Sequence, residues 1–346
     1  MAEVNLRGIS KSFGNISAVQ NLTLPIEDGS FMVLLGPTGA GKTTTLRLLA
    51  GLEEVDTGEV WIGDRNVSKD TPAQRNVAMV FQQYSLYPHM SVRDNLAFPL
   101  RSPLLRTPAD VITQKVQQVA SMLHIEHKLD NKATELSGGE MQRVSIGRAL
   151  VRNPDIYLMD EPLSSLDAKL RAELRLELKR LQADLGATVL YVTHDQVEAM
   201  TMATHIGVLN EGQLVQYGTP REIYEQPASL YVASRLGLPR INMLPADLFG
   251  RAPAEAQQMG LRPEHIQVRQ GADATSATEV EPLAVVHRVE ALGDQTRLHL
   301  QCGEHPLVTL IDPDASFDQG ETVRVAALNP LFFDAEGNRL TTGIRV

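Results

Sequence analysis

The sequence predicts an α/β fold over residues 1–235 and a small β-barrel domain over residues 236–346. Three uninterrupted apolar runs, at residues 31–35, 156–159 and 189–192, are each followed by a glycine or by polar residues. Such runs are typical of parallel strands that are buried on both faces. After residue 281 the apolar runs are short and partly alternating, with turn signals between them, as in an antiparallel β domain. The length of 346 residues also favours two domains.

A helical region interrupts the α/β pattern between about residues 85 and 150. Prolines punctuate its first part, and helical periodicity follows over residues 109–123. We expect this region to form a helical subdomain within the α/β domain. Gly237, Pro239 and Pro245 mark a linker, and residues 251–259 are small and polar.

Composition and charge exclude several classes of protein. The formal net charge of −10 argues against a broad nucleic-acid surface, which would need a basic patch. The single cysteine, Cys302, excludes an internal disulfide. The N-terminus lacks the apolar core of a signal peptide, and no apolar run approaches the roughly 20 residues needed to span a bilayer. We therefore expect a cytosolic chain whose membrane role, if any, depends on a partner.

A phosphate-binding loop follows the first buried run. Its residues fit the pattern G-x-x-x-x-G-K-[ST], and a helix is predicted over residues 44–49. Backbone amides of such a loop and the helix N-terminus bind phosphate oxygens. In this pattern Lys42 reaches the β- and γ-phosphates, and the Thr43 hydroxyl ligates Mg²⁺. The predicted nucleotide-binding residues of the loop are Gly36, Pro37, Thr38, Gly39, Ala40, Gly41, Lys42, Thr43 and Thr44.

Two acidic residues follow the second apolar run. Because ligands bind beyond the carboxyl ends of strands in open α/β sheets, the polar residues after the three runs are expected to converge on one site. Asp160 is suited to hold Mg²⁺ and Glu161 to polarise the water that attacks the γ-phosphate. An isolated Asp-Glu pair would more often face solvent, but a phosphate loop in the same chain favours the catalytic interpretation.

Residues 136–140, Leu-Ser-Gly-Gly-Glu, identify the family. Locally they predict a helix start, with Ser137 as the N-cap and Glu140 as its capping-box partner. Beside the phosphate loop they resemble the signature motif of ABC ATPases. This resemblance implies that Ser137, Gly138 and Gly139 of one subunit contact the γ-phosphate bound by the other, at a helix N-terminus.

The remaining ABC elements follow in the family order over residues 1 to about 235. Phe13 resembles the aromatic residue that stacks on adenine, and Gln82 resembles the glutamine that senses Mg²⁺ and links the site to membrane subunits. Residues 164–167, which end at Asp167, resemble the loop after the acidic strand that crosses the dimer interface in this family. His194 resembles the switch histidine at the γ-phosphate. Each of these residues alone would more often have a structural role.

Glu140 departs from the pattern, because the signature motif usually ends in Gln. Both residues can cap a helix. A carboxylate close to a triphosphate would weaken its binding. We therefore predict that Glu140 points back to the start of its own helix.

Other segments resemble carbohydrate importers of the maltose and glycerol-3-phosphate type. They are residues 82–92, 216–220, 242–245 and 260–265. The resemblance implies a P-loop NTPase (RecA-like) core and a C-terminal regulatory domain of the oligonucleotide/oligosaccharide-binding (OB) type. Only about fifteen residues separate Pro245 from Gly260, so this domain is expected to be shortened.

The resemblance implies a homodimer that closes around two Mg²⁺–ATP complexes. Lys42, Gln82, Glu161 and His194 are the expected catalytic residues, and Thr43, Gln82 and Asp160 the expected metal ligands. Closure would act on two membrane-spanning permease subunits and, through them, on an external solute-binding protein. The chain would then lie peripherally at the cytoplasmic face of the inner membrane and drive uptake of a sugar or sugar-like solute, without binding nucleic acid.

Three alternatives remain open. The cargo could be a polyamine, a metal or an anion, because such importers share this core. A soluble ABC protein acting on nucleic acid is disfavoured by the acidic charge and the 5% aromatic content. An exporter with fused membrane segments is disfavoured by the absence of an apolar span.

Overall fold

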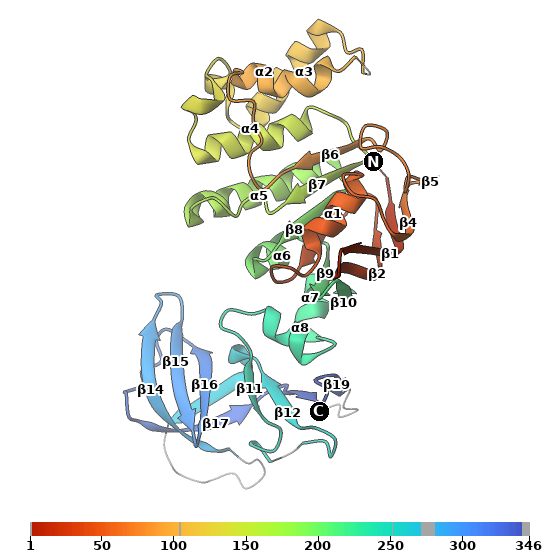
Figure 1. The fold of residues 1–346 in the computed structure, drawn as a ribbon. Coiled ribbons are helices and arrows are strands. Elements are labelled where there is room, and N and C mark those ends of the chain that lie inside the picture. The colour runs from red at the N-terminus through yellow and green to blue at the C-terminus, as the bar shows by residue number, and fades with distance from the viewer. Residues whose placement is uncertain (1, 104, 251, 271–280, 341–346) are drawn as a thin grey trace. The chain divides into compact units, whose positions relative to one another are not determined.

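The computed structural model describes residues 2–103, 105–250, 252–270 and 281–340. The chain divides into two compact units, Met1–Pro220 and Arg221–Val346 (Figure 1). Within the described ranges, no helix has both the length and the apolar character that crossing a membrane requires.

A six-stranded sheet forms the centre of the N-terminal unit, with strand order β10-β9-β3-β8-β7-β6. Its strands are parallel except for the edge pair β9 and β10. The three apolar runs of the sequence form the neighbouring strands β3, β8 and β7, in which every residue is buried. The strand bounds are β3 Phe31–Leu35, β6 Val77–Val80, β7 Ile156–Asp160, β8 Val189–Thr193, β9 His205–Asn210 and β10 Gln213–Gly218.

A four-stranded antiparallel sheet, with order β2-β1-β4-β5, completes the β structure of this unit. Its inward-facing aliphatic side chains share one core with those of the six-stranded sheet. Its strands are β1 Val4–Phe13, β2 Ile16–Ile26, β4 Thr57–Ile62 and β5 Arg65–Asn66.

Helices pack around the six-stranded sheet, and several of them form the predicted helical region (Figure 1). The helix predicted over residues 109–123 is confirmed as α3, and the helix after the phosphate loop as α1. The helices of this unit are α1 Lys42–Ala50, α2 Val92–Ala97, α3 Ala109–Met122, α4 Gly138–Leu150, α5 Ala168–Leu185, α6 Gln196–Met202 and the 3₁₀ turns Phe98–Arg101, Glu126–Lys128 and Ala133–Glu135.

The C-terminal unit contains two antiparallel sheets, with orders β11-β12-β18-β19 and β13-β17-β14-β15-β16. They enclose one apolar core that includes the buried Cys302. The prediction of a β domain is thus confirmed. The strands are β11 Asn242–Pro245, β12 Gln258–Leu261, β13 Ile266–Gln270, β14 Leu283–Ala291, β15 Thr296–Cys302, β16 His305–Ile311, β17 Thr322–Ala327, β18 Leu331–Phe333 and β19 Arg339–Leu340.

Two short helices, α7 Pro220–Glu225 and α8 Leu230–Arg235, precede these strands. The predicted domain boundary at residue 235 assigned them to the first domain, whereas almost all of their residues belong to the second compact unit. The reason is the buried Arg262, which is 2% exposed. Its guanidinium donates hydrogen bonds to the carbonyls of Tyr224 (2.9 Å), Ala233 (3.4 Å) and Leu236, and lies 3.8 Å from the Tyr224 ring centroid.

Replacing Arg262 by Met should destabilise the C-terminal unit by about 2–4 kcal/mol, because three carbonyls would lose a charged donor. Hydrogen-exchange mass spectrometry of the full chain should show about 100-fold faster exchange in residues 258–333. Arg269→Met, at an exposed arginine paired with Glu281, is the matched control and should change exchange little. Equal protection in the two variants would contradict this role of Arg262.

Candidate functional site

The phosphate loop connects β3 to α1 and holds Lys42 in place. The Lys42 ammonium is 5% exposed and donates hydrogen bonds to the carbonyls of Gly36 and Pro37, both at 2.9 Å. The residue before it, Gly41, has a φ of 94°, and a Cβ there would lie 2.4 Å from the Ala18 carbonyl oxygen. Only glycine therefore fits between the loop and β2. As the N-cap of α1, Gly41 adds no side-chain acceptor, and the first turn of α1 holds no acidic residue.

The ends of β7 and β8 bring the predicted acidic and basic residues to this loop. The Thr43 hydroxyl donates to Asp160 Oδ1 at 2.9 Å, and Lys42 Nζ lies 3.8 Å from Glu161 Oε1. The other oxygen of Glu161, Oε2, lies 3.0 Å from His194 Nδ1. Five residues predicted from three separate sequence segments thus form one connected set. We call Lys42, Thr43, Asp160, Glu161 and His194 the phosphate-loop cluster.

Burial shifts the ionisation of two members of this cluster. It lowers the pKa of the Lys42 ammonium, and the neighbouring carboxylates of Glu161 and Asp160 oppose this shift. Burial raises the pKa of Asp160, against which the hydrogen bond from Thr43 acts. The fold thus withholds water from charged groups of this cluster, and perturbed ionisable groups of this kind gather at functional sites.

Sequence reasoning missed Glu198, which lies in the first turn of α6, four residues after His194. Its carboxylate is 3% exposed and accepts hydrogen bonds from the hydroxyls of Thr193 (2.6 Å) and Tyr191 (2.9 Å). Burial raises its pKa. Thr193 in turn accepts a hydrogen bond from the amide of Asp195, so this network holds both residues that flank His194.

Gln82 and Phe13 lie on other elements of the same unit. Gln82 is exposed just beyond β6, and the register of β6 with β7 places it at the same sheet edge as Glu161. Phe13 ends β1 and is 46% exposed. Lys11 Nζ lies 5.5 Å from the Phe13 ring centroid. Neither predicted residue belongs to the phosphate-loop cluster.

The signature segment begins α4, as predicted. Ser137 is the N-cap, and its amide donates to Glu140 Oε2 at 2.8 Å. The prediction that Glu140 points back to its own helix start is confirmed. Sequence reasoning missed Lys128, whose ammonium lies 3.1 Å from Glu140 Oε1.

Tyr84 joins the signature segment to the loop that ends at Asp167. Its hydroxyl lies 3.1 Å from Ser165 Oγ, and a Cβ on Gly138 would lie 3.3 Å from it. A Cβ on Gly139 would clash with Leu170, at 2.2 Å. Asp167 is the N-cap of α5 and accepts from the Leu170 amide at 3.0 Å. The predicted residues of the signature segment and the N-cap of α5 therefore lie around one short loop. These residues are Ser137, Gly138, Gly139 and Asp167.

The residues present fit Mg²⁺ bound to a nucleoside triphosphate. The loop and the first turn of α1 offer backbone amides and a buried ammonium to phosphate oxygens. Thr43 and Asp160 offer two adjacent oxygens of the kind that Mg²⁺ prefers. The groups suited to the metal are hard oxygen donors that include a carboxylate. The groups suited to the phosphates include a positively charged ammonium.

Two family models match the chain. The model described as ABC transporter matches residues 19–164, and the model described as TOBE domain matches residues 259–328. The first match contains the phosphate loop, the signature segment and both acidic residues. The second lies within the C-terminal β unit, where an OB-like domain was predicted.

Similar proteins cover nearly the whole chain. An sn-glycerol-3-phosphate import ATP-binding protein of Ralstonia nicotianae is 44% identical over 353 residues, which cover 94% of each chain. A trehalose/maltose import ATP-binding protein of Thermococcus litoralis is 43% identical over 355 residues, covering 94% of this chain and 95% of its own.

Solved structures of ATP-binding cassettes share the fold of the N-terminal unit. A dimeric post-hydrolysis cassette bound to ADP and Pi is 30% identical with a TM-score of 0.57, and it covers 63% of this chain and 99% of its own. A nucleotide-free cassette matches with 28% identity and the same TM-score, and it covers 63% of this chain and 92% of its own. The chain therefore belongs to the ATP-binding subunits of ABC transporters, in the group that contains the sn-glycerol-3-phosphate and trehalose/maltose import proteins.

Proposed function

We propose that this chain is the ATP-hydrolysing subunit of an importer for a sugar or sugar-like solute. The observation that carries the proposal is the phosphate-loop cluster, in which Glu161 lies between Lys42 and His194. The names of the relatives, which are import ATP-binding proteins, support coupling of hydrolysis to uptake. The ATP-hydrolysing subunit of such an importer lies peripherally at the cytoplasmic face of the cell membrane, where ATP is available.

Each member of the cluster has a chemical role in this proposal. Bound Mg²⁺–ATP would supply the phosphoanhydride bond, with the metal neutralising charge on the phosphate oxygens. Thr43 and Asp160 would hold the metal, assisted by Gln82, and Lys42 would bind the outer phosphates. Glu161 accepts a hydrogen bond from the attacking water and orients it.

His194 stabilises the γ-phosphate. One of its ring nitrogens, Nδ1, faces Glu161, which leaves Nε2 for the phosphate. The hydrogen-bond network of Glu198 fixes the residues on both sides of this histidine.

A second copy of the chain completes each site. Ser137, Gly138 and Gly139 begin a helix of 13 residues, whose N-terminus can bind phosphate across a dimer interface. Phe13 stacks on adenine from the copy that supplies the phosphate loop. The dimeric cassette structures among the solved relatives support this arrangement.

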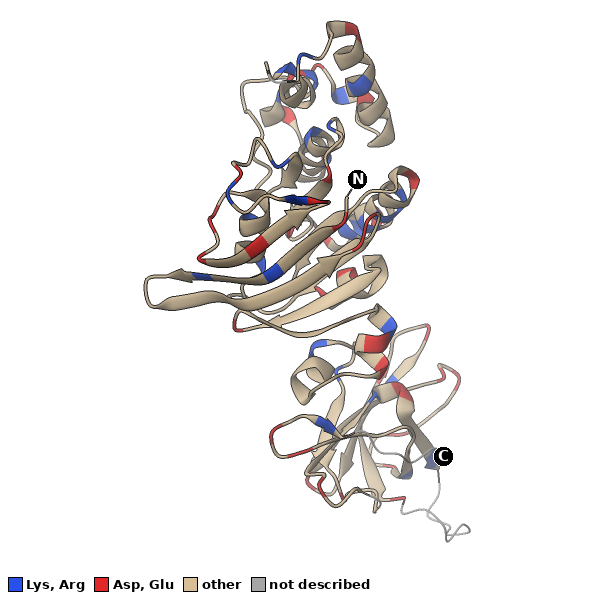
Figure 2. Ribbon diagram, turned by 90° about the vertical axis from the view of Figure 1, so that its right-hand side faces the viewer, with Lys and Arg blue, Asp and Glu red and all other residues tan. Residues whose placement is uncertain are grey.

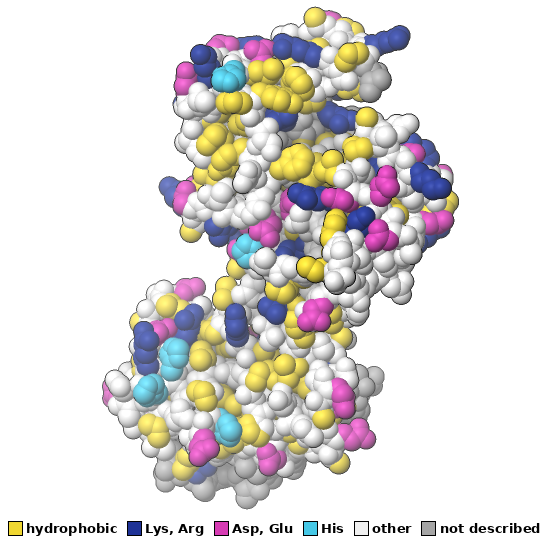
Figure 3. Space-filling model, in the orientation of Figure 1, with side chains coloured by type: hydrophobic (Ala, Val, Ile, Leu, Met, Phe, Trp, Pro, Cys, Tyr) yellow, Lys and Arg dark blue, Asp and Glu magenta, His cyan; other side chains and the backbone are white. Residues whose placement is uncertain are grey.

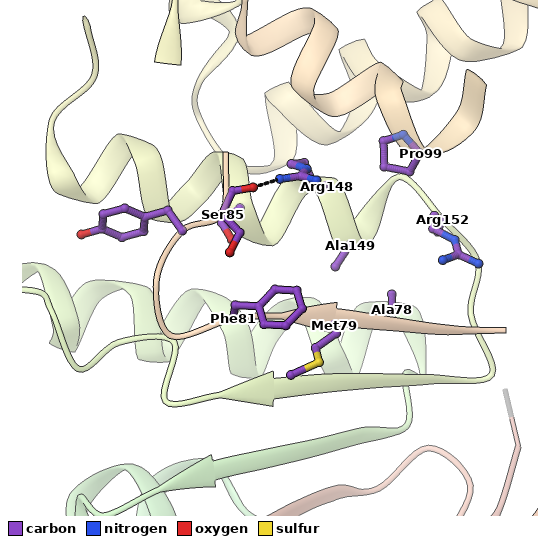
Figure 4. Close-up of a pocket in the computed structure, with 10 residues that line it drawn as sticks. Ala78, Met79, Phe81, Ser85, Pro99, Arg148, Ala149 and Arg152 are labelled. Atoms are coloured by element: carbon purple, nitrogen blue, oxygen red, sulfur yellow. Dashed lines mark hydrogen bonds between the residues drawn. The ribbon is translucent and has the colours of Figure 1, made fainter. Parts of the chain in front are cut away.

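The membrane-spanning partners dock at a cavity beside Gln82. This cavity has a volume of about 150 Å³ and lies between β6, α4 and the 3₁₀ turn Phe98–Arg101 (Figure 4). Phe81 lines it and is 38% exposed, and Arg148 Nε is buried without a hydrogen-bond acceptor among the described residues. Hydrophobic side chains gather on this part of the N-terminal unit (Figure 3). An apolar surface lined by the half-buried guanidinium groups of Arg148 and Arg152 suits a protein partner that brings apolar side chains and an acidic or carbonyl group.

Import of a non-sugar solute and action on nucleic acid are the competing functions. Lys and Arg positions are interspersed with Asp and Glu positions in both units (Figure 2). Over the described residues this mixture does not favour a basic stripe that could follow a phosphate backbone. The names of the relatives favour a saccharide or a polyol phosphate over polyamines and metals.

Replacing Glu161 by Gln should keep ATP binding but lower the rate of hydrolysis by about 100-fold or more, because the water loses its base. The variant should accumulate as an ATP-bound dimer in size-exclusion chromatography. Glu173→Gln, at an exposed position on α5, is the matched control and should hydrolyse ATP as the wild type does. Turnover by Glu161→Gln at the wild-type rate would remove Glu161 from this role.

Replacing Phe81 by Ala should separate transport from hydrolysis. We expect solute uptake in cells to fall about tenfold, because a docking anchor is lost, while the isolated subunit hydrolyses ATP within about twofold of the wild type. Leu176→Ala, at a more exposed apolar residue on α5, is the control. Uptake that is equal in both variants would exclude the cavity as the docking site.

Uptake of a labelled solute panel tests the cargo. In cells where Glu161→Gln replaces the native subunit, uptake of one sugar, sugar acid or polyol phosphate should be lost. The panel also contains polyamines and metal ions, whose uptake should not change. Unchanged uptake across the panel, together with intact wild-type ATPase activity, would contradict the proposed cargo class.

A further inference from the structure

The start of α4 carries a charge that works against its proposed role. The aligned peptide dipoles place roughly half a positive charge at a helix N-terminus, and this charge attracts phosphate. Glu140, in the first turn of α4, adds a full negative charge at the same place. The first turn of α1, which holds the phosphate loop, contains no acidic residue. Left alone, the Glu140 carboxylate would repel a triphosphate that approached α4.

The two oxygens of Glu140 have different partners. Oε2 accepts hydrogen bonds from the amide and the hydroxyl of Ser137, at 2.8 and 2.9 Å. Oε1 lies 3.1 Å from the ammonium of Lys128, which belongs to the 3₁₀ turn Glu126–Lys128. The hydrogen bond from the Ser137 amide contributes most to lowering the pKa of Glu140, and the contacts with the Ser137 hydroxyl and Lys128 lower this pKa further. The carboxylate is therefore ionised at neutral pH, and its charge has to be balanced by a neighbour.

Lys128 ends its own 3₁₀ turn, and its ammonium faces the start of α4. The dipole of α4 repels a cation at this place, and the Glu140 carboxylate offsets that repulsion. Both side chains are only partly exposed, 28% for Lys128 and 24% for Glu140, which keeps their pairing from being fully screened by solvent. When the pair forms, the charges of Lys128 and Glu140 cancel. Only the partial positive charge of the helix dipole then remains at the start of α4.

We propose that Lys128 compensates for the glutamate of the signature segment and so keeps the N-terminus of α4 able to bind the phosphate held by a second copy. The inference rests on the proposed function, in which Ser137 of one copy faces the nucleotide of the other. Lys128 acts through Glu140 and is a positioning residue that makes no contact with the nucleotide. Its effect should depend on the residue at position 140, and this dependence separates it from an ordinary surface lysine.

A double-mutant cycle tests the dependence. In the Glu161→Gln background, ATP-driven dimerisation is measured by light scattering for the parent, Lys128→Met, Glu140→Gln and the double variant. Lys128→Met should raise the ATP concentration for half-maximal dimerisation about three- to tenfold, because two unbalanced carboxylates face phosphate in each dimer. In the Glu140→Gln background the same change should have less than about a twofold effect.

Two further measurements separate charge from structure. The loss in Lys128→Met should shrink as salt is raised from 50 to about 500 mM, since added ions screen the carboxylate, and Lys128→Arg should restore dimerisation. Lys132→Met, at an exposed lysine of the same segment, is the control and should match the parent.

The possible failures can be told apart. A parent that does not dimerise with ATP would overturn the proposed function itself. A parent that dimerises, with Lys128→Met equally defective whether position 140 is Glu or Gln, would overturn the compensation. A Lys128→Met variant that dimerises as the parent does would also overturn it.

Discussion

Parallel pairing of three buried strands is the constraint on which the rest of the structure depends. β3, β8 and β7 lie side by side, and their registers bring the phosphate loop, His194 and Glu161 to one edge of the sheet. Every residue of these strands is buried, so a shift of register would disrupt the packing on both faces of the sheet and would move the site residues apart. Glu161 then contacts both neighbouring segments, with one oxygen toward Lys42 at the start of α1 and the other toward His194 just after β8.

Buried arginines do comparable structural work in the two units. In the N-terminal unit, Arg75 donates to the carbonyls of Leu48 and Leu49 at the end of α1, and to two loop carbonyls before β6. In the C-terminal unit, Arg262 connects three carbonyls from α7, α8 and the residue after α8. A planar guanidinium carries five donors in a fixed fork and can satisfy more widely spaced carbonyls than an ammonium, which has three donors on one atom. Arg75 thereby ties the phosphate-loop helix to the strand that leads to Gln82.

The fold and the phosphate-loop cluster could be predicted from local sequence patterns. Contacts between segments that are distant in the sequence could not. Buried runs, a glycine-rich loop and the Ser137 cap each depend on neighbours in sequence. Asp195 and Glu198 have the spacing of a capping box, yet Glu198 bonds to Tyr191 and Thr193 instead. The partner of Glu140 was equally hidden, because Lys128 lies in a separate turn that only the folded chain brings near.

Tyr84 offers a physical route from the cavity proposed for docking to the segments proposed to meet a second copy. It lines the cavity, and its hydroxyl reaches Ser165 in the loop that ends at Asp167. The same hydroxyl lies against Gly138 in the signature segment. A partner that displaces Tyr84 must therefore disturb both segments proposed to meet the second copy. Because packed protein interiors rearrange between discrete arrangements, a small displacement at the cavity would change the surface that the proposed dimer uses to close.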